Sequence, residues 1–246
     1  HYNSIPTAVR GMLAKFPPQT LRDGDVLMTN DPWICAGHLP DIVLVTPVFH
    51  DGQLVAFAAT VAHHIDVGGK NPGSTTANTT EIFQEGLQLP PLRYFEAGRK
   101  NEAVEDIIRQ NVRIPEVVVH DLDCQMAVNN RGAHRVRVLC AKYGIAVVDA
   151  SFDTAIAGSE RLMREEIACI PDGVYQFRDF LDDDGIVNEP LPIAATVTVQ
   201  GSDLHVDFAG SALQVKGGIN MTPSFRDSYT HLAIRCYLDP DIPQNH

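Results

Sequence analysis

Two short polar segments carry the residue types that bind divalent metals. The first reads Gly-His-Leu-Pro-Asp at residues 37–41, and the second reads Ala-His-His-Ile-Asp at residues 62–66. His38, Asp41 and His63 offer two imidazoles and a carboxylate, which suit zinc, manganese or iron(II) and leave positions open for water or substrate. A cation held in this way lowers the pKa of its bound water and polarises a substrate oxygen. The segments therefore predict one divalent metal centre; the alternative is that these histidines are ordinary turn residues.

A predicted β-hairpin brings the two segments together. Residues 42–48 and 54–62 are apolar enough for two strands, and Asp51-Gly52 between them favours a tight turn with positive φ. The second strand of a hairpin ends beside the start of the first. We therefore expect His63 to arrive next to Asp41, at the end of the hairpin far from the turn.

The adjacent histidines His63 and His64 have different expected roles. Side chains alternate between the two faces of a strand, so only one of these imidazoles can reach the ion. We expect His63 to be the ligand and His64 to pack or hydrogen-bond behind it. Asp66 is either a fourth ligand or the acceptor that orients an imidazole, and the second role is preferred.

Four further carboxylates are candidates for the site or its surroundings. Asp66 and Glu85 are the candidates for proton transfer during catalysis. Asp31 is equally compatible with a turn-forming role and with a place at the site. Asp121 could supply a general base, but we favour it as the N-cap of a helix that starts at Leu122.

Composition narrows the range of partners. The chain has 246 residues, and 19 Lys and Arg against 31 Asp and Glu give a net charge of -12, which disfavours nucleic acid and anionic membranes. Its apolar runs are far shorter than the roughly 20 residues of a membrane span. Five scattered cysteines favour a reducing compartment and mostly buried thiols. We expect a cytoplasmic protein, and we expect the acidic run Asp182–Asp184 to be a solvated turn.

The pattern of apolar residues predicts an α/β protein with mixed sheets, antiparallel hairpins, several helices and an irregular, loop-rich site region. Residues 1–100 form the hairpin-based metal-site region, 101–170 a helical segment, and 171–246 antiparallel strands plus a helix. Besides the hairpin, the expected helices are Ile5–Phe16, Glu102–Val112, Leu122–Tyr143, Asp153–Ile170 and Ser224–Leu238, and the expected strands are Val26–Met28, Val174–Leu181, Leu191–Gln200 and Leu204–Ala209. Residues 68–98 are expected to be irregular and functional, with a phosphate cradle at residues 68–74 as a weak alternative.

Ordered matches along the chain resemble the hydantoinase B / oxoprolinase family, which includes caprolactamase beta subunits and the large subunits of acetone and acetophenone carboxylases. The matching residues are Gly24–Val26, Asn30–Pro32, Gly37–Ile42, Ala62–Gly69, Pro72–Ser74, Gln84–Gly86, Asn111–Arg113, Asp121–Gln125, Pro171–Tyr175, Val206–Ser211 and Asp239–Pro243. Family subunits are about twice as long, so the chain looks like their N-terminal half and one fragment of a multidomain subunit.

The resemblance implies a function that the spacing of the candidate ligands alone does not indicate. It implies a hetero-oligomer with an actin-like-fold ATPase subunit, which uses ATP and Mg to phosphorylate the carbonyl oxygen of a cyclic amide or a ketone. The family's metal ligands match His38, Asp41 and His63, and zinc or manganese is the expected ion. The leading expectation is an ATP-dependent amidohydrolase acting on hydantoin, 5-oxoproline or another lactam. The alternatives are a subunit of a ketone carboxylase and a non-catalytic scaffold subunit.

Overall fold

Two antiparallel sheets form the strand framework of the protein. The structure is a computed structural model that describes residues 4–74 and 78–245. The larger sheet has five strands in the order β3-β2-β1-β4-β5, and the smaller has three in the order β6-β7-β8. The strands are β1 (Val26–Thr29), β2 (Asp41–His50), β3 (Gln53–His63), β4 (Leu92–Glu96), β5 (Arg99–Lys100), β6 (Gly173–Leu181), β7 (Leu191–Gln200) and β8 (Asp203–Asp207). The expected α/β class with antiparallel hairpins is confirmed.

The expected helices are all present; three start within one residue of the expected position, whereas the third and fourth start seven and eight residues earlier than expected. They are α1 (Ser4–Lys15), α2 (Glu102–Asn111), α3 (Pro115–Tyr143), α4 (Ile145–Ile167) and α5 (Pro223–Tyr237), with two short 3₁₀ turns at Pro18–Thr20 and Ile82–Gln84. Because α3 begins at Pro115, Asp121 lies inside the helix, and its predicted N-cap role is wrong. Proline at the first helical position presets φ, and Glu116 in the first turn suits the helix dipole.

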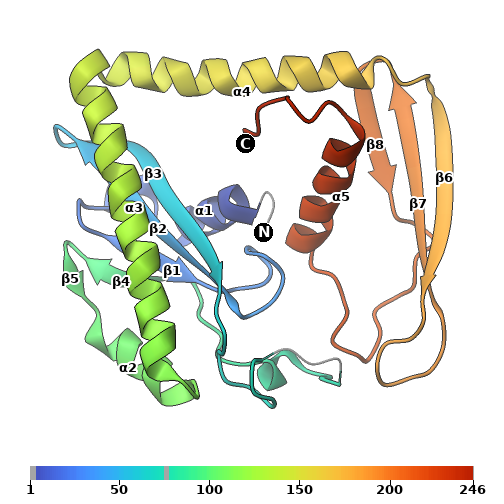
Figure 1. Cartoon of the computed structure of the whole chain (residues 1–246), viewed down its shortest axis with the longest axis horizontal. Coiled ribbons are helices and arrows are strands. Elements are labelled where there is room, and N and C mark those ends of the chain that lie inside the picture. The colour runs from blue at the N-terminus through green and yellow to red at the C-terminus, as the bar shows by residue number, and fades with distance from the viewer. Residues whose placement is uncertain (1–3, 75–77, 246) are drawn as a thin grey trace. The chain divides into compact units, whose positions relative to one another are not determined.

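The five-stranded sheet is covered on both faces, and the alternation of side chains along β2 shows how. Ile42 and Leu44 join the apolar cluster that includes Leu122 of α3. Val43 and Val45 point the other way, into the cluster built around α1. Figure 1 shows α3 lying along β2 and β3. Burying each such side chain contributes about 1.5–3 kcal/mol, so the hairpin that carries the site residues is held firmly from two sides.

The chain divides into two compact units built from non-contiguous segments. One unit contains the described residues up to 74 together with Ile82–Ser151 and Met221–Tyr229, and so holds the five-stranded sheet. The other contains residues 78–81, Phe152–Asn220 and Thr230 onward, and so holds the three-stranded sheet. Helices α4 and α5 each have residues in both units. No described helix combines the length and the apolar character that crossing a membrane requires.

Part of the segment expected to be irregular is a second hairpin. Strand β4 lies inside residues 68–98 and pairs with β5, which directly follows that segment. The turn between them has positive φ at both Ala97 and Gly98. Residues 75–77 of that segment lie outside the described residues. Sequence reasoning missed these strands because β5 is only two residues long and the region is rich in glycine and proline.

Two smaller expectations about side-chain exposure are wrong. Asp184 is 2% exposed and accepts hydrogen bonds from the backbone of Val187, Ile186 and Gly217, so only part of the acidic run is a solvated turn. These hydrogen bonds lower the pKa of Asp184, and the hydrogen bond from Val187 makes the largest contribution. Cys35 and Cys140 are buried as expected, whereas the other three cysteines, Cys124, Cys169 and Cys236, are exposed.

Candidate metal centre

The open end of the β2–β3 hairpin brings three candidate ligands into contact. Asp41 and His63 are direct partners in the register of the two strands. The Nδ1 atom of His63 lies 2.8 Å from Oδ1 of Asp41, and the Nε2 atom of His38 lies 2.6 Å from Oδ2. The two imidazole rings are 5.0 Å apart between centroids. The hairpin therefore places the carboxylate between the two imidazoles, as its register predicts.

The burial of the three side chains suits a site that is open on one side. The Asp41 side chain is 1% exposed, whereas the side chains of His38 and His63 are 41% and 46% exposed. A buried carboxylate is costly unless it is paired or bound to a cation, and here its neighbours are two imidazoles. The accessible imidazoles leave room for a further ligand or a substrate on the solvent side.

The donor set also fits a metal ion by distance. One ligand atom from each residue lies within 4.8 Å of the others, and residues 4–74 and 78–245 hold no other group of three or more histidine, cysteine or acidic side chains that meets this limit. Metal–ligand bonds of about 2.0–2.2 Å place ligand atoms about 3–4 Å apart around a shared ion. The contacts of Asp41 with the two imidazoles, at 2.6 and 2.8 Å, are slightly shorter than this spacing, so an ion would occupy the site with the ligand atoms moved apart.

His64 lies on the opposite face of the hairpin from this site. It is fully buried, and its Nε2 lies 3.0 Å from Oε1 of Gln125 on α3. The Gln125 amide nitrogen donates to Ile42 O at 3.0 Å, so the amide oxygen is the acceptor and His64 donates from Nε2. Burial, opposed by this hydrogen bond, lowers the pKa of His64. A neutral His64 that ties the end of β3 to α3 is the packing role expected for it.

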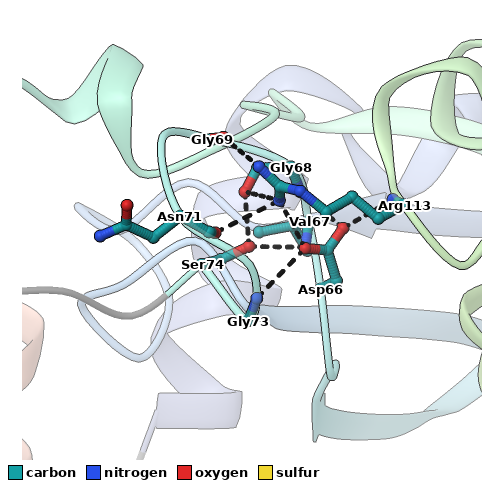
Figure 2. A network of polar contacts seen from close by, with 8 residues as sticks. All are labelled: Asp66, Val67, Gly68, Gly69, Asn71, Gly73, Ser74 and Arg113. Atoms are coloured by element: carbon teal, nitrogen blue, oxygen red, sulfur yellow. Dashed lines mark hydrogen bonds and ion pairs between the residues drawn. The ribbon is translucent and has the colours of Figure 1, made fainter.

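Asp66 is the centre of a different network, drawn in Figure 2. Its carboxylate accepts hydrogen bonds from the guanidinium of Arg113 at 2.7 Å and from the Arg113 backbone at 2.8 Å, and two further bonds from Gly68 and Gly73. Burial alone would raise the pKa of this carboxyl group, but the hydrogen bonds outweigh it and lower the pKa. Asp66 therefore stays ionised, and both of its oxygens are engaged with other partners.

The Asp66 network bears on two expectations about the loop at residues 66–74. Asp66 is not part of the three-residue ligand cluster and orients Arg113 instead of an imidazole, so the roles expected for it at the metal do not match its contacts. An ionised, fully bonded carboxylate is also a poor proton-transfer group. The loop turns the carbonyl oxygens of Gly68, Gly69 and Asn71 toward Arg113. A phosphate cradle would instead present backbone N–H groups to an anion.

Glu85 is a candidate proton-transfer group on the segment beside His38. It is half-buried and close enough to His38 for their charges to interact. Burial raises the pKa of Glu85, and the neighbouring His38 opposes that rise. A carboxyl group whose pKa moves toward neutrality is suited to accept and return a proton.

The loop before His38 is shaped by turn hydrogen bonds and by α5. Asp31 accepts from the backbone of Trp33 at 3.0 Å, so it forms the turn that was one of its two expected roles. Gly37 has φ of +95°, and a Cβ atom there would lie 2.8 Å from Cβ of Phe225 on α5. Both the conformation and the close approach require glycine at this position.

Comparison with solved structures places the fold in a known class. The structure matches the ATP-dependent caprolactamase from Pseudomonas jessenii with a TM-score of 0.85 at 28% identity, covering 96% of this chain and 42% of that chain. The nucleotide-free structure of acetone carboxylase shares the fold, with a TM-score of 0.84 at 19% identity over 96% of this chain and 33% of that chain.

Sequence comparison then gives the family. The model of the hydantoinase B/oxoprolinase family matches residues 1–246, and the chain belongs to this family. It is 37% identical to a putative D-/L-hydantoinase subunit from Pseudomonas sp. (strain NS671) over 218 residues, which are 86% of this chain and 37% of that protein. The chain thus spans well under half the length of this relative and of the caprolactamase.

Proposed function

We propose that this chain is the metal-bearing part of an ATP-dependent cyclic amide hydrolase acting on hydantoin, 5-oxoproline or a related lactam. The observation that carries the proposal is the contact of His38, Asp41 and His63 at the open end of the hairpin, in a member of the hydantoinase B/oxoprolinase family. The relatives support the reaction class, since one is described as a putative hydantoinase subunit and another as an ATP-dependent caprolactamase. A separate actin-like ATPase subunit that uses ATP and Mg is part of the same proposal.

Activation by ATP answers the chemical difficulty of the reaction. An unactivated amide resists attack by water, and phosphorylation of its carbonyl oxygen makes the carbonyl carbon more electrophilic. Addition of water to that carbon lets the C–N bond break as the nitrogen takes up a proton, and phosphate is released when the resulting acyl phosphate is hydrolysed. When bound, a zinc or manganese ion supplies a Lewis acid and a water molecule of lowered pKa. His38 and His63 would hold it through the ring nitrogens that contact Asp41, and Asp41 through its carboxylate. Glu85 would take the proton from the attacking water at its carboxylate oxygens.

Zinc and manganese analysis of the complete protein with its partner subunit tests the metal proposal. We expect close to one ion per copy of this chain, together with ATP turnover that depends on a lactam. Hydantoin, 5-oxoproline and caprolactam form a suitable substrate panel. A metal-free protein that hydrolyses a lactam at full rate would contradict the proposal.

A ketone carboxylase is the second candidate, because acetone carboxylase shares the fold. The same assay separates the two reactions. ATP turnover that depends on a lactam and is unchanged by bicarbonate supports the hydrolase. ATP turnover that requires both a ketone and bicarbonate supports the carboxylase. A non-catalytic scaffold subunit predicts that a complex carrying His38→Ala retains its full rate.

The raised pKa of Glu85 gives a prediction for the pH dependence of hydrolysis. A general base must be ionised, so kcat/KM should fall as the pH drops through a pKa above the ordinary glutamate value of 4.5. Glu85→Gln should remove this acidic limb and lower kcat by about 100- to 10,000-fold. Glu96→Gln, at an exposed glutamate on β4, is the matched control and should leave both unchanged. An acidic limb that persists in the Glu85 variant would assign it to another group.

A further inference from the structure

Asn30 is a fully buried amide whose hydrogen-bonding atoms are all used. Its Nδ2 donates to Leu39 O at 2.7 Å and to Leu87 O at 2.9 Å, and its Oδ1 accepts from the backbone N–H of Leu89 at 2.7 Å. The backbone N–H of Asn30 also donates to Leu89 O at 3.1 Å. One side chain at the end of β1 therefore connects two loops that are distant in sequence.

The two connected loops are the ones that carry His38 and Glu85. Leu39 directly follows His38 in the chain, so the Nδ2 hydrogen bond fixes the backbone next to that imidazole. Leu87 lies two residues beyond Glu85, and its carbonyl is held by the same amide nitrogen. One planar amide group therefore links the backbone beside the imidazole to the backbone two residues beyond the carboxylate.

The other side of the Glu85 segment is fixed by the loop that follows His63. Leu87 N donates to Val67 O at 2.8 Å, and Lys70 N donates to Gln84 O at 2.7 Å. Gly69, with φ of +81°, comes so close that a Cβ atom there would lie 2.6 Å from the carbonyl of Glu85. The short segment that carries Glu85 is thus held on one side by the Asn30 side chain and on the other by the backbone of the loop that follows His63.

We propose that Asn30 is a positioning residue, which sets the placement of Glu85 relative to His38 and so to the metal. This inference rests on the proposed function. Asparagine is suited to the task because it offers two N–H donors and an acceptor at fixed angles from a short side chain. Aspartate has the same shape, but it cannot donate, and its charge would face the carbonyl oxygens of Leu39 and Leu87.

The test compares Asn30→Asp with a matched change at Asn129 in the complete protein with its partner subunit. Asn129 is also a buried asparagine, 2% exposed, and its Nδ2 donates to Leu44 O and Thr46 Oγ1 in the middle of β2, away from the ligand end. Asn129→Asp reproduces the loss of a donor and the buried charge. The readouts are zinc affinity by chelator competition, kcat and KM for the lactam, and the pH profile.

For Asn30→Asp we expect zinc binding about 10- to 100-fold weaker and kcat lower by about 100-fold at saturating zinc, since a misplacement near 1 Å has that effect. The KM should change little, and the acidic limb should move toward the ordinary glutamate pKa. Asn129→Asp should lower thermal stability without these changes. Asn30→Ser, which keeps one donor, should fall between the wild type and Asn30→Asp, and it replaces that variant if the latter does not fold.

The outcomes separate this inference from the proposed function. If the wild-type protein holds no metal or does not turn over a lactam, the proposed function fails. If the wild type does both, and the Asn30 variants match Asn129→Asp in zinc affinity, kcat and pH profile, the positioning role is overturned while the function stands.

Discussion

Replacing Asp41 by asparagine is expected to leave the purified complete protein with little or no bound metal and to lower lactam hydrolysis by more than about 100-fold. Asp41 is the one anionic member of the cluster, and both imidazoles contact its carboxylate. The amide has nearly the same shape but no charge, so the loss would come from the ligand chemistry and not from packing. Elemental analysis and turnover of the complex with its ATPase partner measure both effects.

Asp51→Asn is the matched control for this change. Asp51 lies in the turn of the same hairpin, is exposed, and has φ of 49°, a conformation that asparagine also adopts. This variant should keep its full metal content and rate. Unchanged metal content in Asp41→Asn, with the control intact, would place the ion elsewhere in the protein.

Replacing Arg113 by methionine is expected to lower the free energy of unfolding by about 3 kcal/mol. The Asp66 side chain is 3% exposed, and the substitution would leave its charge without the guanidinium that lies 2.7 Å away. It would also remove the donor shared by three carbonyl groups of the loop. Urea unfolding of the wild type and the variant measures the difference.

The pH dependence and a surface control make this second prediction specific. Because the pKa of Asp66 is lowered in the folded protein, the stabilisation is complete above the ordinary value of 3.8 and is lost as the pH falls through the lowered value. The difference between wild type and variant should therefore shrink in acid. Arg161→Met, which breaks an exposed pair with Glu165, should change stability by less than about 1 kcal/mol. A loss that small for Arg113→Met would show that solvent satisfies Asp66.

The hairpin and its cluster were predictable because their signals are local. Asp51-Gly52 specifies a tight turn, apolar runs specify the strands on either side, and the pairing of Asp41 with His63 follows from the turn. The opposite orientation of His63 and His64 follows from the alternation of side chains along a strand. Each of these inferences uses residues that are close together in sequence.

The contacts that surround the cluster were not predictable because they are made over long sequence separations. The spacing of His63 and Asp66 repeats that of His38 and Asp41, yet β3 ends at His63, so the chain turns Asp66 toward Arg113. That partner is 47 residues away in sequence. The start of α3 is different, since Pro115 followed by Glu116 was a usable local signal.

The location of the candidate ligands at the open end of a hairpin has a consequence for how the site tolerates insertions and deletions. A strand that slips by one residue moves every side chain to the other face. Such a slip of β3 against β2 would bring His64 to the side of Asp41 and turn His63 toward Gln125. Removing one residue at Asp51-Gly52 would therefore disable metal binding from the far end of the hairpin, without altering any ligand.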